Sequence, residues 1–304
     1  MSLLPAAPAT RQLGASGLVI SALAWGRWRL AEGGRGARDA ARLISAALDA
    51  GITLLDTADI YGFDGMSGFG DAERLLGEVL AAEPGLRQRM VLATKGGIMP
   101  PLPYDQSPDY LRGALDASLM RLRTDTIDLY QIHRPDILAH PQEVARMLDE
   151  AVTSGKVRAL GVSNFTPSQI ETLAHFLGHP LVATQPEISP LRIDCFENGE
   201  LDQAVRFSIT PLAWSPLAGG RLLDPKTERE WAVAAKLDRV AAEQGVSRSV
   251  AAFGWLMAHP AGIVPIVGSQ SVERITEAPQ ALTMRWTRSD WYAVLVAARG
   301  EPLP

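Results

Sequence analysis

The chain has 304 residues and a formal net charge of -5, with 47% hydrophobic and 21% charged residues. These values are typical of a globular enzyme with a large core, and the acidic balance gives no support to a nucleic-acid or membrane-surface partner. Cys195 is the only cysteine, which excludes a disulfide framework and a cysteine-based metal site and favours a cytoplasmic location. Residues 1–10 lack the pattern of a signal peptide, and no window approaches the ~18 uninterrupted apolar residues of a membrane span.

Short apolar runs alternate with amphipathic helical patterns along the chain. The first predicted element is a hairpin over residues 11–20. The predicted strands that follow cover residues 22–25, 52–56, 91–95, 127–132, 159–163, 182–187, 208–214 and 263–267. The first four intervals between them carry apolar residues at the i, i+3, i+4, i+7 spacing that places one helix face on a sheet. A last helix is predicted over residues 288–298.

Eight strands alternating with helices favour a closed α/β barrel, the (β/α)8 TIM barrel, over an open doubly wound sheet, which is the structural alternative. The hairpin before the first barrel strand is expected to cover the bottom of the barrel. No linker, repeat or low-complexity tract interrupts the pattern, so a single domain over residues 1–304 is predicted.

Four polar residues stand where three neighbouring predicted strands end. Asp56 ends one strand and Tyr61 follows on its loop, Lys95 ends the next strand, and His133 follows the third. We call these four residues the tetrad. In a barrel the working residues project from the carboxyl ends of strands. The tetrad is therefore predicted to lie together at one mouth.

The tetrad has a clear chemical use. An ammonium within about 4–6 Å favours a phenolate, so Lys95 is expected to lower the pKa of Tyr61. Asp56 would keep Lys95 charged and aimed, and His133 would orient a substrate oxygen. The result is an acid suited to protonating a carbonyl oxygen as hydride arrives at its carbon.

Each tetrad residue also has a structural explanation when it is taken alone. Asp56 could be a turn or cap residue, and Tyr61 and His133 could be satisfied core residues. A lysine that ends an apolar strand needs a partner in any case. Their joint order and spacing favour the catalytic interpretation. The 5 histidines show no ligand spacing, so no metal is predicted.

The sequence resembles the aldo-keto reductases in four ordered motifs. These are residues 51–62, which contain Asp56 and Tyr61, residues 91–97, residues 128–136 with His133-Arg134-Pro135, and residues 155–165. The resemblance extends from residue 11 to about residue 281, and the short tail is most similar to a bacterial branch. It implies reduction of aldehyde or ketone carbonyls with a nicotinamide cofactor, with the tetrad as the catalytic residues.

The resemblance also implies that the cofactor lies extended across the barrel mouth. Ser163, Asn164 and Gln185 would bind the carboxamide, and Trp214 would stack on the nicotinamide. The other implied cofactor contacts are Gly26, Trp28, Asp56, Ser215, Pro216, Leu217, Gly219, Arg221, Gly268, Ser269, Arg274 and Glu277. Arg274 would favour the 2′-phosphate of NADPH, with NADH as the alternative cofactor. Ser163 and Asn164 could instead cap the next helix.

Several positions depart from the family pattern. Arg27 stands where the family often has a smaller residue, and Gly268 where some NADP-preferring branches carry a lysine. Ala278 replaces an asparagine that commonly binds adenine, and Trp214 replaces the more frequent stacking tyrosine. These departures weaken the prediction of NADPH without reversing it.

The implied substrate contacts are Trp28, Tyr61, His133 and Arg134, although Arg134 could equally form a scaffold salt bridge. The expected partner is a small carbonyl compound and the expected state is a monomer. Two other functions stay open: an NAD-dependent sugar or polyol dehydrogenase on the same scaffold, and a non-catalytic nicotinamide-binding regulatory subunit. Retention of the whole tetrad argues against the regulatory subunit.

Overall fold

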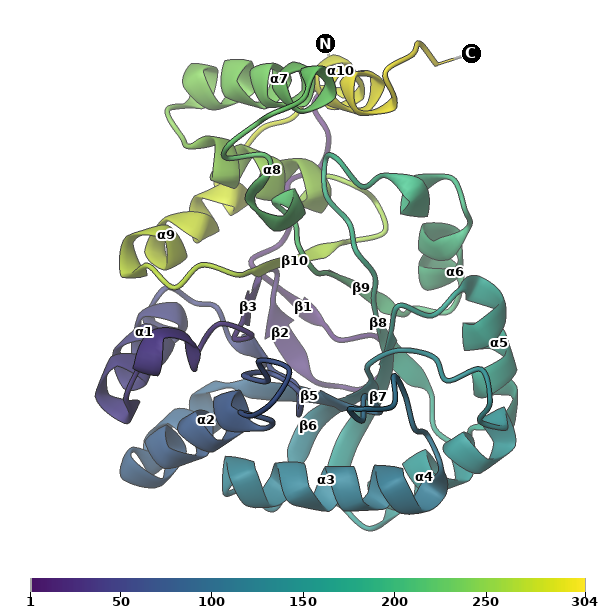
Figure 1. Cartoon of the computed structure of the whole chain (residues 1–304). Helices are drawn as coiled ribbons and strands as arrows, with labels where there is room; N and C mark the ends of the chain where they lie inside the picture. The colour runs from purple at the N-terminus through teal and green to yellow at the C-terminus, as the bar shows by residue number, and fades with distance from the viewer. Residues whose placement is uncertain (1, 304) are drawn as a thin grey trace.

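The structure is a computed structural model that describes residues 2–303. Eight parallel strands close into a barrel in the order β10-β3-β4-β5-β6-β7-β8-β9, and helices surround it (Figure 1). The barrel strands are β3 (Ala24–Gly26), β4 (Leu54–Asp56), β5 (Val91–Gly96), β6 (Ile127–Ile132), β7 (Val157–Ser163), β8 (Leu181–Gln185), β9 (Thr210–Ala213) and β10 (Val264–Val267). Closure confirms the predicted (β/α)8 barrel and excludes the open doubly wound sheet.

Helices follow the strands on the outside of the barrel. The α-helices are α1 (Ala37–Asp49), α2 (Asp71–Ala82), α3 (Pro108–Leu122), α4 (Pro141–Thr153), α5 (Pro167–Phe176), α6 (Glu200–Arg206), α7 (Glu228–Gln244), α8 (Arg248–Met257), α9 (Val272–Glu277) and α10 (Arg288–Arg299). Short 3₁₀ turns are η1 (Glu32–Gly34), η2 (Pro84–Arg89), η3 (Asp194–Phe196), η4 (Ala218–Gly220) and η5 (Ala278–Thr283). In Figure 1 α7 and α10 lie side by side above the ring of helices, and both chain ends lie near α10.

Five predicted strands are longer than the observed ones, and for three of them a contact or a backbone angle accounts for the later start. Ala22 is bonded to the backbone of Ala9 and belongs to the hairpin side, so β3 begins at Ala24. Thr53 and Ser21 exchange backbone-to-side-chain hydrogen bonds, so β4 begins at Leu54. Ser208 has a φ of 54°, which is not extended, and β9 begins at Thr210.

The hairpin consists of β1 (Thr10–Gln12) paired antiparallel with β2 (Val19–Ser21). Its buried side chains Leu13, Leu18 and Ile20 join the apolar cluster that fills the barrel, together with residues such as Leu129 and Leu212. The turn presses closely on the barrel, because a Cβ at Gly14 would lie 2.6 Å from the carbonyl oxygen of Val182. The hairpin therefore covers the amino-terminal end of the barrel, as predicted.

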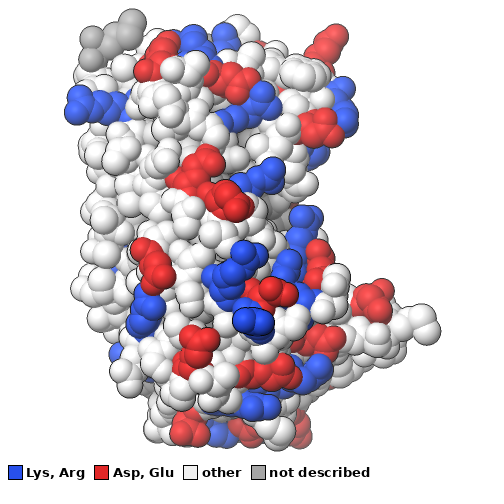
Figure 2. Space-filling view, turned by 90° about the vertical axis from the view of Figure 1, so that its left-hand side faces the viewer, with Lys and Arg blue, Asp and Glu red and all other residues white. Residues whose placement is uncertain are grey.

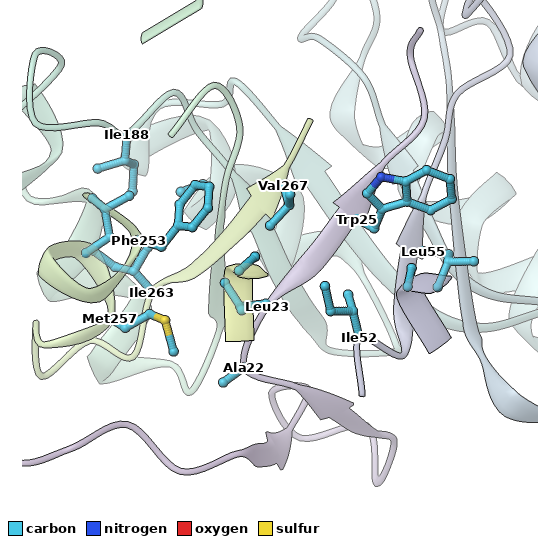
Figure 3. Packing of buried hydrophobic residues seen from close by; sticks show 14 of the residues in the cluster. Ala22, Leu23, Trp25, Ile52, Leu55, Ile188, Phe253, Met257, Ile263 and Val267 are labelled. Atoms are coloured by element: carbon cyan, nitrogen blue, oxygen red, sulfur yellow. The ribbon is translucent and has the colours of Figure 1, made fainter. Parts of the chain in front are cut away.

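A second, larger apolar cluster fills the layer between the barrel and its helices. Figure 3 shows part of it, with Phe253 and Met257 of α8 beside Ile263 and Val267, and with Trp25 and Leu55 on the neighbouring strands β3 and β4. Side chains alternate along each strand, so every second residue enters this outer layer while its neighbours enter the barrel. The barrel wall is thus fixed on both faces.

The surface carries mixed charge. On the face shown in Figure 2, Lys and Arg side chains are interleaved with Asp and Glu rather than gathered into one patch. In the part of the chain that the structure describes, no helix combines the length and apolar character needed to cross a membrane.

Candidate active site

The site is built on a buried lysine at the end of β5. Lys95 has no exposed surface, and its Nζ donates hydrogen bonds to Asp56 Oδ2 at 2.7 Å, the Thr57 carbonyl at 2.8 Å and the Tyr61 hydroxyl at 3.2 Å. An ammonium has three N–H donors, and all three are used here. The neighbouring strands β4 and β5 therefore fix the positions of the ammonium and the tyrosine hydroxyl together.

Asp56 is held on both carboxylate oxygens. While Oδ2 accepts from Lys95, Oδ1 accepts from the side-chain amides of Gln185 at 3.0 Å and Gln131 at 3.3 Å. Gln131 was not among the predicted site residues. The available signal was a single amide side chain within the otherwise apolar end of the strand over residues 127–132.

His133 follows β6 and faces Tyr61. The two rings meet edge to face with their centroids 5.7 Å apart, and His133 is only 9% exposed. Burial lowers the pKa of His133 well below its ordinary value, and the nearby charges of Lys95 and Arg134 lower it further. The imidazole is therefore neutral at neutral pH and offers one N–H donor toward the site.

The expected direction of the Tyr61 pKa is wrong. Burial raises the pKa of Tyr61 above its ordinary value, and the ammonium of Lys95 offsets this only in part. For Lys95 itself, burial lowers the pKa, but Asp56 and Tyr61 outweigh burial and the net pKa is raised. The array at neutral pH is thus a protonated phenol bonded to an ammonium whose charge Asp56 compensates.

A cavity of about 500 Å³ opens above these residues. This volume lies within the usual range for a small-molecule site. Of the predicted site residues, those that line it are Gly26, Trp28, Asp56, Tyr61, His133, Arg134, Ser163, Asn164, Gln185, Trp214, Ser215, Pro216, Leu217, Gly219, Gly268, Ser269 and Arg274. Gly220, in the loop over residues 215–221 that the resemblance places along the pyrophosphate, lines the cavity as well. Lining residues that were not predicted are Arg29, Leu223, Ser249, Phe253, Ile266 and Val267.

Three predicted residues do not line the cavity. Lys95 lies beneath its floor and reaches it only through Tyr61. The Arg221 guanidinium bonds to the Ala218 carbonyl and approaches Glu230 at 3.5 Å. Glu277 accepts a hydrogen bond from Ser247 instead.

A chain of hydrogen bonds joins the residues predicted to bind a carboxamide. Ser163 Oγ donates to the Gln185 carbonyl at 2.8 Å, and Asn164 Nδ2 donates to Ser163 Oγ at 2.9 Å and to the His133 carbonyl at 3.1 Å. Trp214 Nε1 in turn donates to Asn164 Oδ1 at 3.0 Å. The capping alternative is wrong, because the next helix, α5, is capped by Thr166 with Gln169.

The turn after β9 forms another part of the cavity lining, and two arginines, Arg134 and Arg274, also line the cavity. Ser215, Ala218, Gly219 and Gly220 all have positive φ, and the Gly219 N–H donates to Ser215 Oγ at 2.8 Å. Among residues 2–303 the guanidinium groups of Arg134 and Arg274 form no hydrogen bond or ion pair. The scaffold salt bridge considered for Arg134 is therefore absent from this part of the chain, and its charge faces the cavity.

No cluster of three or more His, Cys, Asp and Glu side chains in residues 2–303 has the geometry to hold a metal ion. Cys195 is buried beside Glu200, and burial raises the pKa of its thiol. A thiol in this state is a poor nucleophile.

Comparison with known proteins identifies the family. The model of the Aldo/keto reductase family matches residues 22–295. The chain belongs to the aldo-keto reductases. It is therefore an oxidoreductase enzyme, and the resemblance seen in its motifs is confirmed.

Individual relatives agree with this assignment. A 6-dehydroglucose reductase of Novosphingobium aromaticivorans is 73% identical over 304 residues, which is 100% of both chains. A second 6-dehydroglucose reductase, of Agrobacterium fabrum, is 38% identical over 294 residues, covering 93% of this chain and 96% of the relative. The crystal structure of the thermostable aldo-keto reductase Tm1743, in complex with the inhibitor epalrestat, superposes with a TM-score of 0.82 at 26% identity, covering 95% of this chain and 99% of that one.

Proposed function

We propose that this aldo-keto reductase uses NADPH to reduce aldehyde or ketone carbonyls to alcohols, and that its substrate is a sugar aldehyde of the 6-dehydroglucose type. The observation that carries the reaction is the Lys95 hydrogen bond to the Tyr61 hydroxyl at the floor of the cavity. The 73% identity with the reductase of Novosphingobium aromaticivorans, over the full length of both chains, supports the substrate.

The cavity wall has the chemistry that a nicotinamide dinucleotide needs. Bound there, the nicotinamide supplies the hydride. Asn164 and Ser163 would hold its carboxamide beside the indole of Trp214, and the turn over residues 215–220 would hold the pyrophosphate through backbone N–H groups. The Arg274 guanidinium has no partner among residues 2–303 and would take the 2′-phosphate that distinguishes NADPH from NADH.

The chain's own part of the reaction is the proton. Tyr61 donates its phenolic proton to the carbonyl oxygen, which the neutral His133 positions through an N–H donor. As the phenolate forms, the fully buried Lys95 ammonium at 3.2 Å stabilises its charge. Asp56 keeps that ammonium charged and directed. Arg134, whose charge is free to face the cavity, would donate to hydroxyl groups of a sugar.

The assay follows the loss of NADPH or NADH with 6-dehydroglucose and, for comparison, with benzaldehyde. We expect a clear preference for NADPH and for the sugar aldehyde. Reduction of benzaldehyde alone would remove the sugar substrate but keep the reductase. Preference for NADH would favour the sugar or polyol dehydrogenase. Cofactor binding without turnover of any carbonyl would favour the regulatory subunit.

Tyr61→Phe tests the proton donor directly. The variant keeps the ring but loses the hydroxyl, so carbonyl reduction should fall by about 10²–10⁴-fold, the usual contribution of a general acid. NADPH binding, followed by quenching of tryptophan fluorescence, should change little. An unchanged rate of reduction would remove Tyr61 from this role.

A further inference from the structure

One buried cation near the site has no part in the reaction as described above. Arg27 has no exposed surface, and its three guanidinium nitrogens have no hydrogen-bond partner within residues 2–303. Burying a charge without a partner is costly. A group kept at such a cost needs an explanation.

Arg27 is adjacent to the tetrad through the backbone. It directly follows Gly26, which pairs with Asp56 in the β3–β4 register, and its own N–H donates to the Asp56 carbonyl at 3.0 Å. Burial lowers the pKa of Arg27 to about 10, while the carboxylates of Asp56 and Glu73 raise it in opposition. The guanidinium is therefore charged at neutral pH and lies in the field of both carboxylates.

The surrounding charges leave Arg27 without a carboxylate of its own. Glu73 on α2 already accepts from Arg121 of α3 at 2.7 Å and from the Thr94 hydroxyl of β5. Asp56 is already bonded to Lys95. A further buried carboxyl group, Asp59 in the loop after β4, has a pKa raised well above its ordinary value by burial and by Glu73, which favours its neutral form.

The count of these charges is unbalanced. Three basic side chains, Arg27, Lys95 and Arg121, stand against two carboxylates that already form ion pairs, Asp56 with Lys95 and Glu73 with Arg121. On the cavity side, His133 is neutral and Arg134 adds a further positive charge. Another buried phenol, Tyr130 of β6, stays protonated because burial raises its pKa. Among these named side chains there is thus one more cation than carboxylate, and Arg27 is the cation without an ion-pair partner in residues 2–303.

We propose that Arg27 is a positioning residue for the reduction: its buried guanidinium places a fixed positive charge behind Asp56 and, through the Asp56–Lys95 pair, stabilises the phenolate that Tyr61 becomes after it gives up its proton. This inference rests on the proposed function only for the identity of the reaction. A fixed charge in a dry interior acts over a longer range than one at the surface.

The main test is Arg27→Met, which removes the charge and keeps most of the volume. Replacing a buried, unpartnered cation by an apolar side chain should leave the melting temperature unchanged or raise it. At the same time kcat for reduction should fall about tenfold, the equivalent of one pKa unit. The titration of Tyr61, read as tyrosinate absorbance with Tyr61→Phe as the blank, should move to higher pH. The KM for the carbonyl and the Kd for NADPH should not change.

Two further variants separate charge from packing. Arg27→Lys keeps the charge and should restore kcat and the Tyr61 titration toward the original values. Arg89→Met removes an exposed cation that pairs with Asp49 on the surface, and it should leave both unchanged because solvent screens that charge.

Each other outcome overturns the proposal. A lower melting temperature in Arg27→Met with no change in the Tyr61 titration would make Arg27 structural. An unaltered kcat, or an Arg27→Lys variant that behaves like Arg27→Met, would remove the electrostatic role. Failure of the unmodified enzyme to reduce any carbonyl would contradict the proposed function instead, while the melting temperature and the Tyr61 titration would still decide whether Arg27 acts on Tyr61.

Discussion

At the scale of single residues, the site depends on how fully the hydrogen-bonding groups of Asp56 and Lys95 are used. The Lys95 ammonium uses its three donors on Asp56, Thr57 and Tyr61, and the Asp56 carboxylate accepts from Lys95, Gln131 and Gln185. Neither group has freedom to turn without leaving a buried polar atom unpaired, which costs roughly 1–3 kcal/mol. The Tyr61 hydroxyl is therefore held by a rigid pair.

Asp56→Asn tests the two roles of the Asp56–Lys95 pair, in the stability of the fold and in carbonyl reduction. The variant leaves the buried Lys95 ammonium without its carboxylate, so the free energy of unfolding should fall by about 3–5 kcal/mol. Reduction should also fall, because Tyr61 alone then opposes the lowering of the Lys95 pKa by burial. Denaturant unfolding and steady-state rates measure the two effects.

The double variant Asp56→Asn/Lys95→Met is the control. It removes both charges and should recover part of the stability without recovering activity. A single variant as stable as the original protein would mean that the ion pair contributes little to folding.

In the original protein the pKa of Lys95 is raised on folding, so its stabilising contribution is complete below pH ~10 and is lost as the pH rises through the raised pKa.

What the sequence predicts at this scale is the identity of residues that end strands. Asp56, Lys95 and His133 are recognisable because each stands at a point where an apolar run stops, and Tyr61 because it follows Asp56 on the same loop. The direction of the Tyr61 pKa could not be predicted in this way, because it depends on how deeply the phenol is buried. Gln131 and Arg27 were not predicted as site residues for a similar reason: both contact Asp56, which lies on a different strand.

At the scale of elements, periodicity predicts which segments are helices and strands better than where they end. The strand over residues 127–132 coincides with β6, whereas β4 and β9 begin later than predicted. Their ends are decided by contacts distant in sequence, such as the exchange between Thr53 and Ser21. Helix packing also depends on features that hydrophobic periodicity does not predict, such as small residues where two helices lie close together.

Two glycines in neighbouring helices provide a matched test of such a contact. A Cβ at Gly77 in α2 would lie 2.0 Å from the Arg121 carbonyl of α3, whereas a Cβ at Gly113 in α3 meets nothing within 4 Å. Gly77→Ala should therefore force α2 away from α3 and lower the free energy of unfolding by about 1–3 kcal/mol. Gly113→Ala should raise it by up to about 1 kcal/mol through helix propensity.

Urea unfolding of both variants measures these differences. Both substitutions add the same methyl group to a helix. A similar change in the free energy of unfolding in both variants would therefore show that α2 and α3 can move apart at little cost. Lower activity in Gly77→Ala would be a secondary expectation, since Glu73 and Arg121 of these two helices bond across the same contact behind the site.

At the scale of the whole molecule, barrel closure brings residues from seven of the eight strands and their loops, all except β5, to one cavity. The alternation of elements predicts this closure, and the apolar hairpin at the other end completes the interior. The shape of the far wall is less predictable, since it is made by irregular turns after β9 and β10, and the turn after β9 has positive φ at residues 215 and 218–220. That wall is where Arg221 and Glu277 were expected and where other partners hold them.

Because that wall would hold most of the cofactor, binding should stabilise the whole barrel. NADPH at 100 times its Kd should add about 2.7 kcal/mol to the free energy of unfolding. This corresponds to a rise of roughly 5 °C in melting temperature for a domain of this size. NADH at the same concentration should give a smaller rise, because it lacks the 2′-phosphate that would pair with Arg274, whose guanidinium bonds to nothing within the described residues 2–303.

Arg274→Met should make the two cofactors equivalent by lowering the rise with NADPH to that with NADH. Arg285→Met, an exposed position outside the cavity lining, is the matched control and should preserve the difference. Thermal melts with each cofactor show whether Arg274 distinguishes NADPH from NADH. They need no substrate, so they test the cofactor site independently of the reaction. Equal stabilisation of the original protein by NADPH and NADH would contradict the role of Arg274, since a bound 2′-phosphate facing a free guanidinium must bind more tightly than a hydroxyl.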